Sequence, residues 1–277
     1  MWLKPVLAAM LAACGVFALA VVTKQPSHAR AWQPHLSRLP VVARDGDRFS
    51  ISQYRSWAYS ADVPVSETWH ELAPHDIRDV RRAWFVVEPH PGLAVMAHTL
   101  VLFEFADDDL IGLTVEARKE AGESYSALRG ALNAFELVYE WATPRDLLTR
   151  RAVMMDRELY MYPLALSQDE TEAYLDGLLQ KTEAIERRAR FYNTATSNCT
   201  NELAKTAGLS WDPAFILTGY SAKALHRMRR IAADGDFESV RAHARIDSRV
   251  RDLATLPDAA FNAELLKASR DTFGLAP

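Results

Sequence analysis

Cysteine is scarce in this chain of 277 residues, which holds only Cys14 near its beginning and Cys199 far downstream. The part of the chain beyond the first fourteen residues therefore has one thiol and cannot form an internal disulfide. Proteins of oxidising compartments usually pair their cysteines. An unpaired thiol in an exported protein is accordingly a reactive group or a pairing site.

Basic residues are not in excess either. The chain has 32 lysines and arginines against 36 aspartates and glutamates, a net charge of −4, and no long run of one sign. Binding to nucleic acid depends on a basic surplus that neutralises phosphates, so we expect no nucleic-acid partner. The proportions of 49% hydrophobic and 25% charged residues suit one globular domain of fair size.

A long apolar run occurs only at the beginning of the chain. Lys4 precedes P-V-L-A-A-M-L-A-A-C-G-V-F-A-L-A-V-V-T, residues 5–23, which is long enough for the core of a signal sequence and almost long enough to span a bilayer. We therefore expect residues 1–31 to be a signal sequence or membrane anchor. The remainder, 32–277, is expected in the periplasm or elsewhere in the cell envelope.

Three interpretations of this N-terminal segment stay open. The A-R-A sequence at 29–31 resembles a cleavage site, although it lies far from the apolar core. The sequence L-A-A-C ending at Cys14 resembles a lipidation motif, although the residues that follow are apolar. In the third interpretation, residues 5–23 stay uncleaved and anchor the protein in the inner membrane. All three place residues 32–277 outside the cytoplasm, and a retained or lipidated N-terminal segment would give the protein contact with a membrane.

The clearest strands are expected in the first half of the chain. Residues 94–105 and 110–117 are nearly continuous apolar runs around a polar D-D-D turn, which predicts a hairpin. Residues 135–142 alternate as a further strand, and residues 159–166 are extended with Pro163 near their end.

Helices dominate the second half. Ser167 and Glu170 form a capping-box pattern that opens a helix running to about residue 190. A second helix is expected over residues 199–207, with Gly208 at its C′ position. The outline is an α+β fold, an antiparallel sheet packed on helices. We assign residues 32–225 to this domain and 226–277 to a helical C-terminal extension.

Cys199 lies where the second of these helices begins. Thr196, Ser197 and Asn198 precede it, and all three are good N-cap residues, so the sulfur is expected in the first helical turn. The positive end of the helix dipole favours a thiolate there. A free cysteine can also be a small buried packing residue, but the polar flanks and the export of the chain favour a nucleophile.

His98 is the best candidate for a base that activates the thiol. It interrupts an otherwise apolar strand, and a buried imidazole needs hydrogen bonds. The alternative is a histidine whose hydrogen bonds are satisfied in the core and that has no chemical role.

Glu116 is the candidate third member of the site. With a loop over residues 107–109, residue numbers paired across the hairpin would sum to 216, so His98 would face Arg118. Glu116 would then lie diagonally from His98 on the same face, where a carboxylate could orient the imidazole. Alternatively, Glu116 pairs with an arginine such as Arg118 or Arg145.

No metal site and no cofactor are expected. The sequence H-E-L-A-P-H from His70 to His75 looks like a zinc-protease motif, but its histidines are five residues apart rather than four. Pro74 would also disrupt the helix that such a motif needs.

Several blocks of the sequence, in order, resemble the Lnb N-terminal periplasmic domain family. They are H-T-L-V-L-F-E-F, L-T-V-E-A-R-K-E-A-G-E-S-Y-S, T-P-R-D-L-L-T-R-R, L-Y-M-Y-P-L and N-C-T, and the resemblance covers roughly residues 50–225. It implies a circularly permuted papain-like cysteine fold, because the histidine strand precedes the cysteine helix. In the better-understood members it implies lipoprotein N-acylation through a cysteine–histidine pair.

On this chain the resemblance maps that pair to His98 and Cys199. It places Glu116 and Arg118 near the pair and puts Arg145 and Asp146 in a supporting shell. Asn198 and Tyr192, on either side of the turn before the cysteine helix, complete the candidate set; Tyr192 either lines the site or caps the preceding helix. The chain departs from the family pattern at Asn201, where many members have threonine. It also has none of the membrane helices that follow this domain in the acyltransferases.

The sequence thus predicts a periplasmic, membrane-associated thiol enzyme that transfers or hydrolyses acyl groups of a lipid or lipoprotein. One alternative is a cysteine peptidase or amidase that acts on cell-wall peptides. The other is a non-catalytic module of the envelope that uses its cleft for binding. A long apolar groove beside Cys199 would favour a lipid, and an open polar cleft would favour a peptide.

Overall fold

The computed structural model describes residues 24–106 and 108–276. The expectations for residues 5–23 and for Cys14 lie outside the described residues. Within the described ranges, none of the helices has both the length and the hydropathy needed to cross a membrane.

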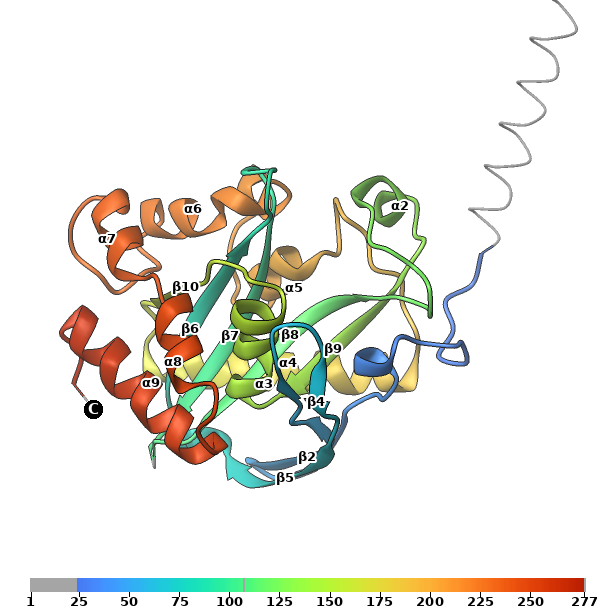
Figure 1. Cartoon of the computed structure of the whole chain (residues 1–277), viewed down its shortest axis with the longest axis horizontal. Helices are drawn as coiled ribbons and strands as arrows, with labels where there is room; N and C mark the ends of the chain where they lie inside the picture. The colour runs from blue at the N-terminus through green and yellow to red at the C-terminus, as the bar shows by residue number, and fades with distance from the viewer. Residues whose placement is uncertain (1–23, 107, 277) are drawn as a thin grey trace, which may run out of the picture.

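One mostly antiparallel sheet forms the centre of the molecule (Figure 1). Its strand order is β1-β2-β9-β8-β7-β6-β10, and β5 also pairs with β2. The strands are β1 (Val41–Asp45), β2 (Arg48–Arg55), β5 (Trp69–Asp76), β6 (Val80–Pro89), β7 (Ala97–Phe105), β8 (Leu110–Arg118), β9 (Glu136–Ala142) and β10 (Tyr160–Pro163). A separate two-stranded pair consists of β3 (Ala58–Tyr59) and β4 (Pro64–Ser66).

Helices follow mainly after the strands, as the sequence predicts. They are α2 (Ala127–Ala131), α3 (Pro144–Thr149), α4 (Gln168–Arg187), α5 (Cys199–Thr206), α6 (Ser221–Arg227), α7 (Phe237–His243), α8 (Asp247–Leu253) and α9 (Asp258–Phe273). Short turns of helix are η1 (Pro34–Leu36), η2 (Ile77–Asp79), η4 (Pro213–Phe215) and η5 (Thr218–Tyr220), and η3 (Arg150–Met154) is a π-helical turn that continues α3. The α+β class is confirmed.

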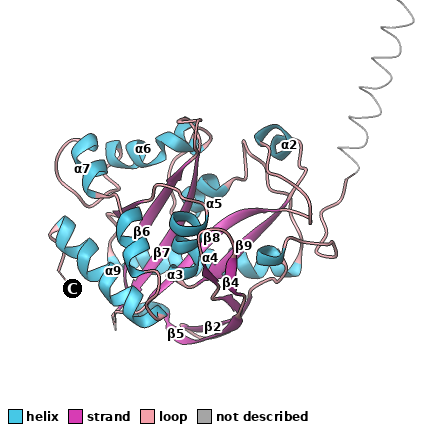
Figure 2. Cartoon of the chain, in the orientation of Figure 1, coloured by secondary structure: helices cyan, strands magenta, loops and turns pink. Residues whose placement is uncertain are grey.

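Both faces of the sheet are covered by helices (Figure 2). Along β7, Val101 and Phe103 point into the core shared with α4 and α5, whereas Leu100 and Leu102 point into the core shared with α3, α8 and α9. This alternation is the period of two expected of a strand buried on both faces. Helices α8 and α9 of the C-terminal 226–277 segment therefore complete the second core.

The start of α4 follows the predicted capping box. Ser167 Oγ accepts a hydrogen bond from the Glu170 amide, and the Glu170 carboxylate accepts one from the Ser167 amide. These two reciprocal bonds satisfy amides that have no partner inside the helix. The helix ends at Arg187 instead of near residue 190.

The β7–β8 hairpin forms, but the predicted register is wrong by two residues. Its turn closes where the Phe105 amide bonds to the Asp109 carbonyl, helped by Asp108 in the left-handed conformation with φ of 62°. Leu100 therefore pairs with Thr114, and paired residue numbers sum to 214. Because the shift is even, Glu116 stays on the same face as His98, as predicted.

The sheet divides next to this hairpin. Pairing between β7 and β8 stops at Leu100 and Thr114, although β7 stays paired with β6 to Ala97 and β8 stays paired with β9 to Arg118. Figure 1 shows β6 and β7 diverging from β8 and β9 above this point. Helix α5 packs against both β7 and β8. The division of the sheet thus leaves room for the first turn of α5 beside the start of β7, which carries His98, and the end of β8, which carries Glu116.

Candidate active site

Cys199 is the first residue of α5, which confirms its predicted place in the first helical turn. Asn198 caps the helix, since its side-chain oxygen accepts a hydrogen bond from the Asn201 amide. The Asn198 side chain also donates to the carbonyls of Thr194 and Phe215. These bonds fix the start of α5, and Cys199 is held there with only 4% of its surface exposed.

His98 and Glu116 meet across the division of the sheet. His98 Nε2 lies 2.6 Å from Thr114 Oγ1 and 3.2 Å from Glu116 Oε1. The Thr114 hydroxyl donates its proton to Glu116 Oε1 at 3.1 Å, so the threonine oxygen must accept from Nε2. Nε2 therefore carries a hydrogen, and the imidazole also forms a hydrogen bond with the Cys199 side chain.

Cys199, His98 and Glu116 shift one another's protonation. Burial raises the pKa of the Cys199 thiol, but the charge of His98 and a hydrogen bond with it outweigh burial and lower that pKa. Burial likewise opposes charge on His98, yet Glu116 and Cys199 together raise the pKa of the imidazole. The pKa of Glu116 lies well below its usual range, because His98 and Arg151 outweigh its burial. The geometry thus favours a thiolate, an imidazolium and a carboxylate in a row.

Arg151 is the functional side chain that sequence reasoning missed. It is 2% exposed; its Nη2 lies 3.0 Å from Glu116 Oε1, and its Nε lies 3.0 Å from Glu88 Oε2. It extends from the π-helical turn η3 that continues α3. The alternative that Glu116 pairs with an arginine was right in kind, but the arginine is Arg151, and Glu116 contacts His98 as well.

Arg118 and Arg145 lie away from the Cys199–His98 pair. The Arg118 guanidinium donates to the carbonyls of Leu36 and Ser37. Arg145 forms an ion pair with Asp258 at the start of α9. Both arginines therefore tie distant segments of the chain to the domain.

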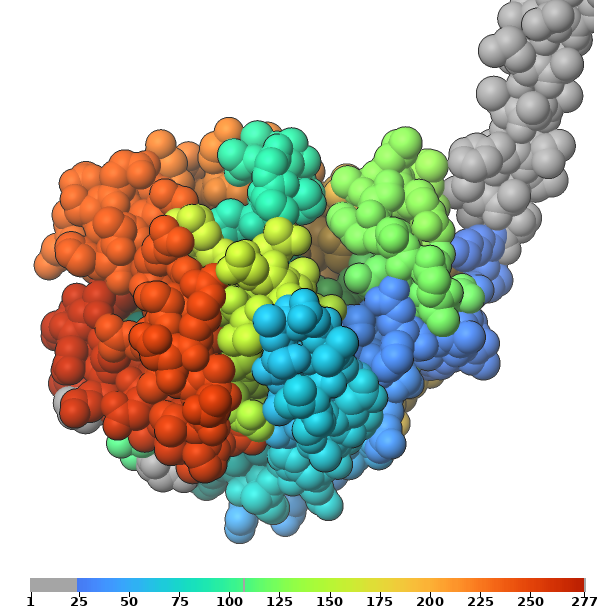
Figure 3. Space-filling model, viewed as in Figure 1, coloured from blue at the N-terminus to red at the C-terminus, as the bar shows by residue number. Residues whose placement is uncertain are grey.

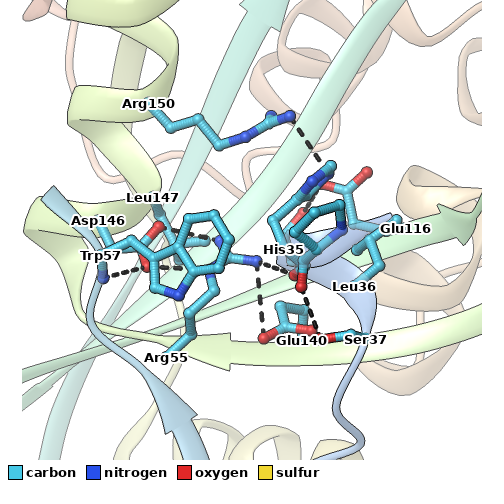
Figure 4. Close-up of polar contacts among 12 residues, drawn as sticks. His35, Leu36, Ser37, Arg55, Trp57, Glu116, Glu140, Asp146, Leu147 and Arg150 are labelled. Atoms are coloured by element: carbon cyan, nitrogen blue, oxygen red, sulfur yellow. Dashed lines mark hydrogen bonds and ion pairs between the residues drawn. The ribbon is translucent and has the colours of Figure 1, made fainter. Parts of the chain in front are cut away.

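Asp146 belongs to a second ionic cluster, which also contains Arg55 and Glu140 (Figure 4). Arg55 donates to its two carboxylate oxygens at 2.8 and 2.9 Å. The Trp57 amide and the Tyr59 hydroxyl bond to the same carboxylate. Asp146 has no exposed surface, and none of these bonds reaches His98 or Cys199. This aspartate joins β2 and the following segment to α3.

A pocket of about 280 Å³ lies directly over Cys199, and His98, Glu116 and Asn198 also line it. Tyr192 forms part of its wall, close to the Tyr125 hydroxyl, and caps no helix. Figure 3 shows the surface hollowed between the turn that joins β6 to β7 and the segment around α2. Of the predicted residues, the pocket therefore gathers Cys199, His98, Glu116, Asn198 and Tyr192.

The described part of the chain contains no cluster of three residues that could hold a metal ion. His70 and His75, which carry the misleading zinc-protease pattern, lie on strand β5 instead of a helix. The two side chains therefore do not share a helical face, and the pattern has no metal-binding geometry.

The fold and the pocket define an α+β domain with a lone thiol at a helix start, facing an imidazole and a carboxylate carried by strands. The model of the Lnb N-terminal periplasmic domain family matches residues 66–232, more than half of the chain, so the protein belongs to that family. The match includes Cys199, His98, Glu116 and Arg151, and it supports a periplasmic location. No curated protein and no solved structure matches the chain.

Proposed function

We propose that this protein is a periplasmic thiol enzyme that transfers or hydrolyses acyl groups, with Cys199 as nucleophile and His98 as general acid and base. The observation that carries the proposal is the pairing of a thiol with a lowered pKa and an imidazole with a raised one on the floor of a pocket. Perturbed pairs of this kind concentrate at catalytic sites.

The first half of the reaction forms an acyl-enzyme. The Cys199 thiolate attacks the carbonyl carbon of an ester or amide and forms a C–S bond. The C–O or C–N bond then breaks, and the leaving alkoxide or amine takes the proton of the His98 imidazolium. Glu116, held by Arg151, keeps the imidazole oriented throughout.

The second half regenerates the enzyme. An amine or a water molecule attacks the thioester while neutral His98 takes its proton, and the C–S bond breaks to release the thiolate. Transfer to the terminal amine of a lipoprotein would be N-acylation, and transfer to water would be hydrolysis. In both halves the Cys199 amide, which has no acceptor inside the helix, can donate to the oxyanion.

An apolar rim around the pocket favours a lipid over a cell-wall peptide. We define this rim as Leu93, Tyr125, Leu217 and Tyr220, which are 47%, 40%, 43% and 47% exposed. Each lies within three residues of a side chain that lines the pocket. Exposed apolar groups gathered at a pocket mouth are suited to contact an acyl chain or a membrane surface.

Alkylation of Cys199 by iodoacetamide, an uncharged reagent, tests the pair. We expect wild type to react rapidly at pH 6.5, because the lowered pKa of Cys199 increases the fraction of its sulfur that is thiolate. His98→Ala should react at least about 10-fold more slowly, since general acid–base partners contribute ~10²-fold or more. Cys199→Ser should not react, and His243→Ala, which alters an exposed histidine, is the matched control. Equal rates for wild type and His98→Ala would contradict the proposal.

Trapping the acyl-enzyme separates catalysis from binding. Incubation with a p-nitrophenyl ester should add one acyl mass to wild type and none to Cys199→Ser, as measured by intact mass spectrometry. Rapid alkylation without any acyl-enzyme or turnover would support a non-catalytic binding module. Cleavage of peptide amides with no action on esters would support the peptidase.

A further inference from the structure

Two cations of the pocket have no carboxylate partner among the described residues. Arg150 and Lys119 both line the pocket over Cys199. Arg150 contacts only neutral groups, His35 Nε2 at 3.2 Å and Met155 Sδ at 3.5 Å. The Lys119 side chain takes part in no hydrogen bond or ion pair within residues 24–106 and 108–276.

His35 holds Arg150 in place without neutralising it (Figure 4). Burial lowers the pKa of His35 to about 2, and the charge of Arg150 acts in the same direction. The imidazole is therefore neutral, and Nε2 accepts a hydrogen bond from the guanidinium. Arg150 keeps its full positive charge beside a pocket.

The carboxylates of the pocket are already engaged. Glu116 meets His98 and Arg151, while Glu88 meets Arg151 and, at 3.8 Å, Arg157. Besides its histidines, the pocket is thus lined by one lysine and three arginines, Lys119, Arg150, Arg151 and Arg157, against two glutamates. Burial lowers the pKa of Lys119 and of Arg150. The charge of Arg151 acts in the same direction on both, and outweighs, together with burial, the opposing charge of Glu116. Partly buried cations without a counter-ion are costly, and an anion between them would remove that cost.

We propose that Arg150 and Lys119 form a subsite for the phosphate of an acyl-bearing phospholipid whose ester carbonyl lies at Cys199. This rests on the proposed function and names its substrate class. A guanidinium fork and an ammonium group together match the several oxygens of a phosphate. The cationic pocket binds the headgroup, while the apolar rim contacts the acyl chains.

The apolar rim is continuous on the side of β6 and β7. The Gly219 amide donates to the Val95 carbonyl at 3.0 Å, and a Cβ on Gly219 would lie 2.1 Å from the Ala94 carbonyl oxygen. This close approach joins the turn that carries Leu93 to the segment that carries Leu217 and Tyr220. A single apolar edge next to a cationic pocket fits an anionic amphiphile better than a free anion.

The course of the chain agrees with a lipid surface at this rim. Lys24, which directly follows the apolar sequence 5–23, bonds through its ammonium group to the Ala134 carbonyl just beyond α2. Helix α2 lies on the other side of the pocket, next to Tyr125, and Figure 1 shows the described chain beginning on this side. An apolar N-terminal segment in a bilayer would keep the pocket near the lipid headgroups.

Acyl transfer from the phospholipid to Cys199 needs only the thiol and the imidazole of the site. The thiolate forms the thioester, the ester C–O bond breaks, and the lysophospholipid leaves as an alcohol carrying the His98 proton. Arg150 and Lys119 exchange no proton, and the phosphate leaves with the lysolipid.

Protection of Cys199 from iodoacetamide by ether lipids tests the subsite without turnover. Ether analogues cannot acylate the thiol, so protection measures binding alone. We expect monomeric di-O-hexyl-glycerophosphoglycerol to half-protect wild type at about 10-fold lower concentration than neutral di-O-hexylglycerol, as one charge-assisted contact provides. Arg150→Gln with Lys119→Gln should abolish that advantage. Arg150→Lys and Lys119→Arg should retain most of it.

Control variants and ligands distinguish a failure of the phosphate subsite from a failure of the proposed function. Arg81→Gln removes an exposed cation outside the pocket and should leave protection unchanged. The single variant Lys119→Gln covers the case in which the double variant does not fold. Equal protection by the two ethers, or protection insensitive to both substitutions, would overturn the subsite. The subsite would also be overturned if inorganic phosphate or a tetraglutamate peptide protected Cys199 as well as the phospholipid ether does. Slow alkylation independent of His98 would instead contradict the proposed function.

Discussion

Glu116 and Glu140 lie on neighbouring strands, β8 and β9, and each faces an arginine, yet their protonation shifts in opposite directions. Glu116 is 21% exposed and has a pKa well below its usual range. Glu140 has no exposed surface, and burial raises its pKa to about 8, helped by the nearby charge of Asp146. A glutamate that faces an arginine is therefore charged at Glu116 and largely protonated at Glu140.

The hydrogen-bond donors explain the difference. Arg55 directs its fork at Asp146, and its Nη1 is 3.6 Å from Glu140 Oε1 without a hydrogen bond, so both Glu140 oxygens lack a donor. Glu116, in contrast, accepts from Arg151 and from the hydroxyl of Thr114 and faces the charge of His98. The closed cluster, Arg55, Glu140 and Asp146, is buried and joins segments of the fold. The open cluster, Glu116, His98 and Arg151, lies at the pocket and directs its charge toward it. Substitutions should therefore affect stability in the first and thiol reactivity in the second.

The largest effect is expected for Asp146→Ala. It removes the carboxylate that accepts two hydrogen bonds from the buried Arg55 and leaves Glu140, 3.6 Å away, as the remaining carboxylate near the guanidinium. Breaking a buried pair of this kind typically costs about 3–5 kcal/mol. Urea unfolding should show this loss, and the folded fraction should still alkylate Cys199 rapidly. Asp234→Ala, at an exposed position, is the control. A loss below about 1 kcal/mol would mean that Asp146 does not hold the closed cluster together.

Glu140→Gln should make the protein more stable at alkaline pH. Folded Glu140 keeps its proton up to about pH 8, whereas in the unfolded chain it releases the proton near the ordinary glutamate pKa of 4.5. The unfolded state therefore binds fewer protons between these values, and wild-type stability falls as pH rises through this window. The glutamine mimics the protonated form and removes that loss, by about 4 kcal/mol at pH 8.

Urea unfolding of wild type and Glu140→Gln at pH 5 and pH 8 measures this difference. The two proteins should differ little at pH 5. A glutamine variant less stable than wild type at pH 8 would show that Glu140 is charged in the folded protein.

Glu116→Gln should affect reactivity more than stability. Without the carboxylate the pKa of His98 falls and that of Cys199 rises, so alkylation at pH 6.5 should slow by about 10-fold, equivalent to ~1.4 kcal/mol. Its pH profile should shift toward that of an ordinary thiol. An unchanged profile would show that Glu116 does not position the imidazole.

The smallest effect is expected for Arg145→Gln. The ion pair with Asp258 is 16% and 33% exposed on its two sides, and such pairs contribute about 1 kcal/mol or less. Alkylation of Cys199 should equal that of wild type. A clear drop in reactivity would return Arg145 to the supporting role that the family resemblance implies.

Some of these assignments followed from patterns within a few residues. Asn198 before Cys199 predicted a capped helix, and Ser167 with Glu170 predicted another, because capping bonds join residues three apart. His98 was recognisable because a histidine is unusual in an apolar strand. The correct face of Glu116 also followed, since the side-chain period of two tolerates an even error in register.

Other features depended on distant parts of the chain. Arg118, Arg145 and Arg151 all occur in blocks shared with the family, yet only Arg151 reaches Glu116. Arg151 is carried by the π-helical turn that continues α3, and no local pattern in the sequence predicted this turn. The hairpin register was misjudged because the turn closes through the backbone of Asp109.

The sequence by itself determined the alternation of the strands, the caps of the helices and the presence of one thiol beyond the N-terminal segment. Local hydrogen bonds and periodicity decide these, so they can be read from neighbouring residues. Only the tertiary structure decided that β7 and β8 separate, that Cys199 lies beside His98, and that Arg150 and Lys119 share a pocket without an ion pair to any described carboxylate. Those outcomes depend on contacts between residues far apart in the chain, whose geometry is fixed only when both faces of the sheet are packed.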